Sequence, residues 1–156
     1  MKRILFLLFC SISFFANAQK EELPYIKKEF LIIHSSKDYE SALKKANEAS
    51  KKLKIKIALR DLKPNKEIGL SYSNAACEDE FGFFPCYVAR GRYDDGIYVS
   101  IEYSDAYLEF EKGYYIVVLS SFINNDAKNK NLLVKAKKIY KDAYLKASKV
   151  YVGCIH

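Results

Sequence analysis

Two stretches of the chain share one pattern of apolar and polar positions. Each contains a charged residue, a run of bulky apolar residues and a Ser-Ser pair; the stretches are Lys28–Lys37 (KEFLIIHSSK) and Lys112–Phe122 (KGYYIVVLSSF). A short, continuous apolar run bounded by polar residues is typical of a strand that is buried on both faces. We therefore predict strands at Phe30–His34 and Tyr114–Leu119.

A lysine-rich helical pattern follows each predicted strand. Apolar residues recur at three- and four-residue spacing between Tyr39 and Leu53, and again between Leu132 and Tyr140. Residues that can cap a helix start precede both stretches: Ser35, Ser36 and Asp38 in the first, and Asn124, Asn125 and Asp126 in the second. Each stretch is therefore predicted to be an amphipathic helix.

Each predicted helix leads into a segment with strand character. Apolar and polar residues alternate in KIKIALRD (residues 54–61), and AYLKASKVYVGC (residues 143–154) is typical of a returning strand with a kink near Ser148. Two such βαβ units can share one antiparallel sheet with both helices on the same face. The predicted fold class is therefore α+β, a ferredoxin-like βαβ-βαβ sandwich.

The region between the two units, at about 63–112, differs in composition and is predicted to be an insert. KPNKEIG and SYSNAACEDEFGFFP contain turn-forming Pro and Gly and indicate loops. The stretch CYVARGRYDDGIYVSIEYS (residues 86–104) predicts a β-hairpin with its turn at Asp95-Gly96. Asp105–Lys112 could be a short helix or an extended link, and we favour the helix.

The N-terminus has the features of a signal peptide. A basic pair at residues 2–3 precedes an almost wholly apolar run, Ile4–Phe15, and the small-x-small motif Ala-Asn-Ala follows at 16–18. A membrane anchor is the alternative, but about 12 apolar residues are too few to span a bilayer, which needs roughly 20. We predict a signal peptide at residues 1–18 and a single domain at 19–156. The domain would be periplasmic or secreted, with no stable membrane insertion after cleavage.

The chain is basic, with a formal net charge of +7 at pH 7. The excess is spread along the chain, which is typical of solvated helix faces, although it could attract polyanions such as cell-wall polymers. Export argues against nucleic acid as a partner.

Three cysteines follow the predicted cleavage site: Cys77, Cys86 and Cys154. An exported protein meets an oxidising compartment, so we expect a disulfide, and favour Cys77–Cys86 because it would close a short loop. Cys154 would then be free, or would replace one partner. Cys154 and His156 could instead bind zinc, but their spacing matches no closed ligand pattern, so we expect no metal and no cofactor.

Motifs that indicate catalysis are missing from the sequence. It contains no Gly-x-Ser-x-Gly elbow, no phosphate-binding Gly-Lys loop and no dinucleotide-binding glycine pattern. His34 lies in an apolar run, which favours a packed histidine over a general base. An enzyme acting on wall polymers would have to use Glu78, Asp79, Asp94 or Glu102, and none has a neighbour in sequence that would adapt it to acid–base work. We predict that the protein is not an enzyme.

Tyrosine is unusually frequent: the chain has 13 tyrosines and no tryptophan. Tyr87 and Tyr93 would share one face of the first strand of the predicted hairpin, and Arg90 and Arg92 would share the other. Tyrosine rings can stack on sugars, and arginine can bind carboxylate or acetamido oxygens. The alternative is that the tyrosines fill the core of the sheet with their hydroxyls at its rim.

The second unit, over residues 112–154, resembles the SPOR (sporulation-related repeat) domain. Tyr114, Tyr115, Val117, Ser121 and Phe122 match the aromatic-led first strand of that family, and Val150, Tyr151, Val152 and Gly153 echo its later strand. Ser120 replaces the usual glycine, and the insert is not part of the usual domain. The resemblance implies a βαββαβ sandwich that binds peptidoglycan glycan strands lacking stem peptides. We expect the ligand to lie on the sheet face opposite the helices, bound by Tyr87, Arg90, Arg92, Tyr93, Tyr98 and Tyr114.

A second hypothesis is a protein-interaction module of the inhibitor or immunity type, with an envelope protein as its partner. Its binding element would be the loop closed by Cys77 and Cys86, with Phe81, Phe83 and Phe84 as exposed anchors. This hypothesis requires that the three rings are not buried in the protein's own core.

Overall fold

Strand β1 (Tyr25–Ser36) contains the first predicted apolar run and extends it in both directions. The computed structural model describes residues 24–153. The predicted signal peptide at residues 1–18, and the pair Cys154 and His156, therefore lie outside the described residues. Within β1, the four residues from Phe30 to Ile33 are all buried, because both faces of the strand are covered.

Helix α1 (Tyr39–Leu53) follows β1 as predicted. It begins after Asp38, whose carboxylate accepts a hydrogen bond of 2.8 Å from the backbone N–H of Ser41. Its buried stripe consists of alanines, namely Ala42, Ala46 and Ala49. These small side chains let the helix backbone approach the sheet closely.

The second unit is also observed, as β5 (Tyr115–Ile123), α3 (Ala127–Lys137) and β6 (Tyr144–Tyr151). Asp126 caps α3 by accepting from the backbone N–H of Lys128 at 2.7 Å. Strand β6 runs through Ser148 without interruption, so the predicted kink there is absent.

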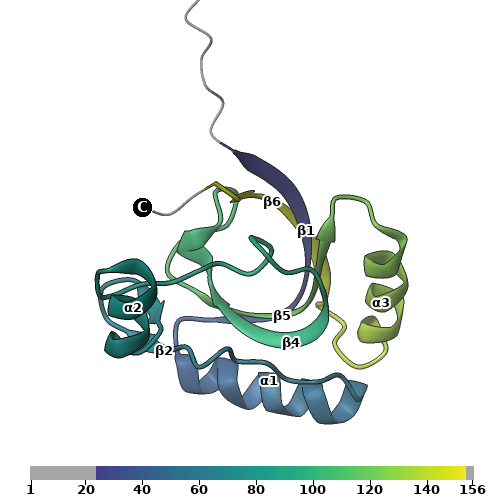
Figure 1. The fold of residues 1–156 in the computed structure, drawn as a ribbon. Helices are drawn as coiled ribbons and strands as arrows, with labels where there is room; N and C mark the ends of the chain where they lie inside the picture. Colours follow the sequence, from purple (N-terminus) through teal and green to yellow (C-terminus); the bar gives the residue numbers. More distant parts are fainter. Residues whose placement is uncertain (1–23, 154–156) are drawn as a thin grey trace, which may run out of the picture.

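The strands form a four-stranded antiparallel sheet in the order β4-β5-β1-β6, in which β4 is Gly96–Tyr103. Helix α1 lies between β1 and β4 in the chain, and α3 connects β5 to β6 (Figure 1). A small hairpin of β2 (Lys63–Asn65) and β3 (Gly69–Ser71) precedes helix α2 (Asn74–Phe81). The described residues therefore form an α+β fold.

Each face of the sheet has its own hydrophobic core. The core under the helices consists of Leu31, Ile33, Ala42, Ala46, Ala49, Leu62, Leu70, Val99, Ile101, Val117, Leu119, Leu132, Ala136, Tyr140 and Ala143. The core on the opposite face consists of Phe30, Ile32, Tyr107, Phe110, Ile116, Val118 and Val150. Helices α1 and α3 contribute only to the first core, so both lie on one face, and the segment 104–114 helps to cover the other.

The strand predicted at residues 54–61 does not form. Lys54, Arg60 and Asp61 have φ angles of 55°, 56° and 56°, which interrupt an extended backbone. Only an isolated parallel bridge joins Ile57 to Val99 of β4. The strand that follows α1 in the sheet is β4, so the insert lies before this strand and not after it.

The insert differs from its prediction in three places. Residues 86–95 form no strand, so only the second half of the predicted hairpin is present, as β4. The stretch predicted as a loop contains α2, which Ser73 caps and Gly82 ends in the left-handed conformation. The short helix predicted at Asp105–Lys112 is limited to one 3₁₀ turn, η1 (Ser104–Ala106).

Within residues 24–153, no helix has both the length and the apolar character that crossing a membrane requires.

Helix α3 is attached to the sheet by one buried polar side chain, Asn129. Its Nδ2 donates to the carbonyl of Glu29 at 2.8 Å, and its Oδ1 accepts from the Ser120 hydroxyl at 2.5 Å. The Ser120 hydroxyl of β5 therefore has a buried partner on α3.

We expect Asn129→Ala to lower the free energy of unfolding by about 1–3 kcal/mol, because two buried polar groups lose their partner. Urea unfolding followed by circular dichroism measures the change. Asn131→Ala is the matched control, since Asn131 is exposed on the same helix and should leave stability nearly unchanged. Equal effects of the two substitutions would contradict the assigned role.

Candidate functional site

Arg90, one of the residues predicted to bind a ligand, is fully buried, with 0% of its surface exposed. Its guanidinium donates to the carbonyls of Tyr98, Gly96 and Val118 and to the hydroxyls of Ser100 and Ser121, at 2.8–3.2 Å. It also stacks on the Tyr98 ring, 3.5 Å from the centroid. These contacts bind residues 86–95 to β4 and β5, so Arg90 has a structural role.

Glu102 lies beside Arg90 in the same interior and is also fully buried. One of its carboxylate oxygens accepts from Arg60 at 2.5 Å, from the Tyr87 hydroxyl at 2.6 Å and from the backbone N–H of Arg90 at 3.2 Å. The Tyr107 hydroxyl contacts the same oxygen at 3.4 Å. We call Glu102 and its four partners, Arg60, Tyr87, Arg90 and Tyr107, the buried polar cluster.

Three side chains of this cluster, Tyr87, Tyr107 and Arg60, have pKa values raised above their usual ranges. Burial raises the pKa of Tyr87 and of Tyr107 well above the usual range, and the Glu102 carboxylate raises both further. Burial alone would lower the pKa of Arg60, but the attraction of Glu102 raises it. A general acid or base must exchange a proton near the working pH, and the raised pKa values keep Tyr87, Tyr107 and Arg60 protonated there.

The remaining predicted arginine and tyrosines are distributed over different environments. Tyr93 is 70% exposed, and the Arg92 guanidinium lies between its ring and that of Tyr151, at 4.9 and 4.8 Å. Tyr98 is half-buried, and its hydroxyl donates to Asp94. The six predicted ligand-binding residues therefore do not share one open face.

Tyr114 lines an open cleft on the sheet face opposite the helices. The cleft has a volume of about 260 Å³. Its aromatic lining comes from Phe110, Tyr114 and Tyr144, and its charged lining from Glu111 and Lys146. We call it the Tyr114 cleft. Ile32 of β1 and Ile116 of β5 contribute the sheet's own side chains to its lining.

A disulfide joins Cys77 to Cys86, as predicted. The backbone N–H of Cys86 donates to the Ser71 hydroxyl at 3.1 Å, and the carbonyl of Cys86 accepts from Tyr72 at 3.1 Å. The loop is therefore fastened both to α2 and to the end of β3. A disulfide is consistent with an oxidising compartment outside the cytoplasm.

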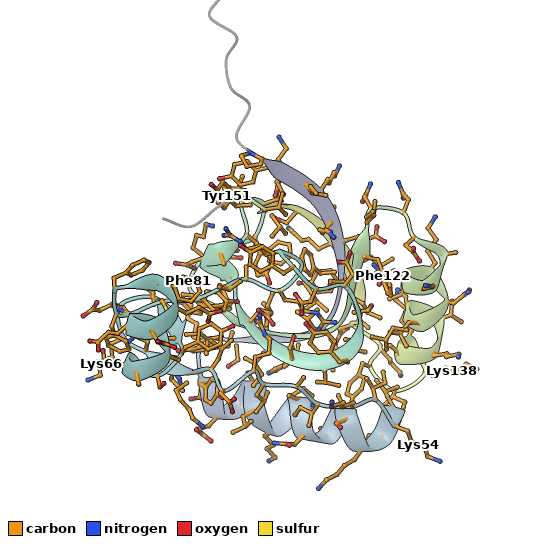
Figure 2. All side chains as sticks on the ribbon, viewed as in Figure 1. Lys54, Lys66, Phe81, Phe122, Lys138 and Tyr151 are labelled. Atoms are coloured by element: carbon orange, nitrogen blue, oxygen red, sulfur yellow. A yellow bond between two sulfur atoms is a disulfide. The ribbon has the colours of Figure 1, made fainter. Side chains whose placement is uncertain are left out.

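The aromatic rings of this loop are not part of either core. Phe83 and Phe84 are each 48% exposed, and Phe81 is half-buried with its ring 6.3 Å from that of Phe83. We call residues 77–86 the aromatic loop. Figure 2 shows Phe81 at the end of α2, on the opposite side of the molecule from α3.

A second open cavity, of about 450 Å³, adjoins the aromatic loop. Phe81 and Phe83 form one wall, and Ile68 and Tyr87 contribute further apolar surface. We call this cavity the aromatic groove. Sequence reasoning identified the rings but missed the groove, because Asp105 and Ala106 reach it from a more distant part of the chain.

The acidic residues considered for catalysis do not converge. Glu78 and Asp79 are exposed on α2, Asp94 accepts from Gly91 and Tyr98, and Glu102 is bound within the buried polar cluster. Among residues 24–153, no group of His, Cys, Asp and Glu side chains could hold a metal ion.

Comparison with known proteins assigns no family. No family model, no curated protein and no solved structure matches the chain. The SPOR resemblance stays a prediction. Most of its residues lie in β5 and at the end of β6, whereas Tyr114 directly precedes β5 and Val152 and Gly153 follow β6.

We expect Arg90→Met to lower the free energy of unfolding by about 3 kcal/mol, because three carbonyls and two hydroxyls lose their donor in the interior. Denaturant unfolding of the purified protein, residues 19–156, measures the change. Tyr93→Ala serves as the control, since its ring is largely exposed and its loss should change stability by less than about 0.5 kcal/mol. An unchanged unfolding midpoint for Arg90→Met would overturn its structural assignment.

Proposed function

We propose that this protein is an exported, non-enzymatic binding domain that engages an envelope protein through the aromatic loop. The exposure of Phe83 and Phe84, 48% each, carries the proposal. Neighbouring phenylalanines that the fold leaves outside both cores are the kind of anchor that concentrates binding energy at protein interfaces.

The rigidity of the aromatic loop supports the same function. The Cys77–Cys86 disulfide closes it, and backbone hydrogen bonds fasten Cys86 to Ser71 and Tyr72. A loop held in one conformation loses little conformational entropy when it binds, so more of the contact energy contributes to affinity. An inhibitor or immunity protein needs this kind of preorganised element.

The test is capture of exported proteins on the immobilised mature protein, compared with Phe83→Ser/Phe84→Ser. We expect one protein to be retained in near-stoichiometric amount by the wild type, and its affinity to fall by about 30-fold or more in the double variant, as expected for loss of hot-spot residues. Val134→Ser is the matched control, because Val134 is 64% exposed on α3 and lies outside the loop. Equal retention by all three proteins, or by none, would refute the proposal.

Glycan binding at the Tyr114 cleft is a second candidate function. The cleft lies on the sheet face that the SPOR resemblance implies, and its combination of aromatic rings with Glu111 and Lys146 suits a sugar that carries polar substituents. Of the residues expected to bind glycan, Tyr114 is the one that lines it. Arg90 is buried, so it would support the cleft only indirectly.

Sedimentation with insoluble peptidoglycan tests this second function. We expect Tyr114→Ala/Tyr144→Ala to reduce the bound fraction by about tenfold, as loss of two stacking rings implies. Val134→Ser, at an exposed position on α3, should leave it unchanged. Binding of the wild type no greater than that of a boiled sample would exclude glycan recognition.

For the fold family, we propose a ferredoxin-like sandwich of the SPOR type. Its support is the strand order β4-β5-β1-β6, with α1 between β1 and β4, α3 between β5 and β6, and both helices on one face. In this arrangement β4 takes the position for which residues 54–61 were predicted.

A further inference from the structure

We propose that the aromatic groove docks on a basic surface of the protein partner, where a large apolar side chain is flanked by lysine or arginine. This inference rests on the proposed function of the aromatic loop and specifies the partner's chemistry. The groove pairs apolar walls from Ile68, Phe81 and Phe83 with two exposed carboxylates, Glu67 and Asp105, and no basic side chain lines it.

The helix that carries Phe81 has three further carboxylates. Glu78, Asp79 and Glu80 are consecutive, exposed and placed directly before Phe81 on α2. Among the described residues, none of the three forms an ion pair with a lysine or arginine. Two basic side chains lie near the groove without lining it: Lys66 precedes Glu67 in the chain, and the Lys112 ammonium donates to the carbonyl of Asp105 at 3.0 Å.

This local charge is opposite to that of the whole chain. The protein has 26 basic against 19 acidic residues, yet the groove beside the exposed Phe83 is lined by two carboxylates and by no basic side chain. A partner with cations around an apolar side chain would neutralise these carboxylates and fill the groove at the same time. Complementary charge of this kind speeds association and selects the partner, while the apolar contact supplies most of the affinity.

The same charges exclude other occupants of an exposed aromatic loop. A loop that inserts into an anionic membrane surface carries lysine or arginine next to its aromatic rings, and three acidic residues would be repelled there. Nucleic acid and anionic wall polymers would be repelled for the same reason. A second copy of the groove would bring like charges together. A basic protein surface remains the complementary occupant.

The test uses two synthetic peptides of equal length that share a Leu-Phe centre, one flanked by arginines and the other by glutamates. Both are titrated into the ¹⁵N-labelled mature protein. We expect the arginine peptide to shift the amides of residues 67–68, 78–86 and 105, and its affinity to fall as salt is added. Glu78→Lys/Glu80→Lys should weaken it by about tenfold or more. The control, Asp142→Lys, changes an exposed acidic residue between α3 and β6 and should have no effect.

The outcomes separate this inference from the proposed function. If both peptides bind equally and only Phe83→Ser abolishes binding, the inference on charge is wrong and the aromatic loop keeps its function. If the arginine peptide does not shift the groove amides while Phe83-dependent capture of a partner persists, the inference is again wrong and the proposed function stands. If neither the peptide nor an exported protein binds at the loop, both are wrong.

Discussion

The buried guanidinium of Arg90 is the interaction on which the rest of the structure depends. It is a charged group with 0% exposure, and its donors are used on three carbonyls and two hydroxyls of β4 and β5. Because a charge in the interior is costly unless every donor is used, this side chain fixes how the segment 86–95 crosses the sheet. Gly91 assists, since its φ of 88° and its missing Cβ allow the backbone to pass close to the Phe30 ring.

The segments 86–95 and 104–114 cover much of the sheet face opposite the helices, where the ligand was expected to bind. Tyr87 and Tyr107 turn inward to Glu102, and the rings of Phe110 and Tyr107 pack on Phe30 at 5.8 and 4.9 Å. The tyrosines that the sequence offered as sugar-stacking candidates therefore fall into two groups. Some complete the interior with their hydroxyls satisfied, and a few remain at openings on the surface.

The sequence predicted the regular parts of the fold and missed the parts that long-range contacts determine. Strands β1 and β5 and helices α1 and α3 follow from apolar periodicity and capping residues, because these signals are local. The prediction of a first hairpin strand was wrong. The alternation of Tyr and Arg at residues 87–93 also fits an irregular segment whose arginine points into the core. Helix α2 was missed because its eight residues have almost no apolar face toward the protein apart from Cys77.

The candidate site was predictable to the same extent. The disulfide and the phenylalanines of the aromatic loop follow from residue types and spacing, whereas the groove needs Glu67, Ile68 and Asp105, which the tertiary fold brings together. The segment 104–114 then separates the two openings: its start lines the groove at Asp105 and Ala106, and its end lines the cleft at Phe110 and Tyr114. Hydrogen bonds between Ser104 and Tyr114, at 2.8 and 2.9 Å, close this segment on itself. The segment 104–114 thus forms a wall of both the aromatic groove and the Tyr114 cleft. A ligand in either opening would contact the same segment, which also packs Tyr107 and Phe110 into the core.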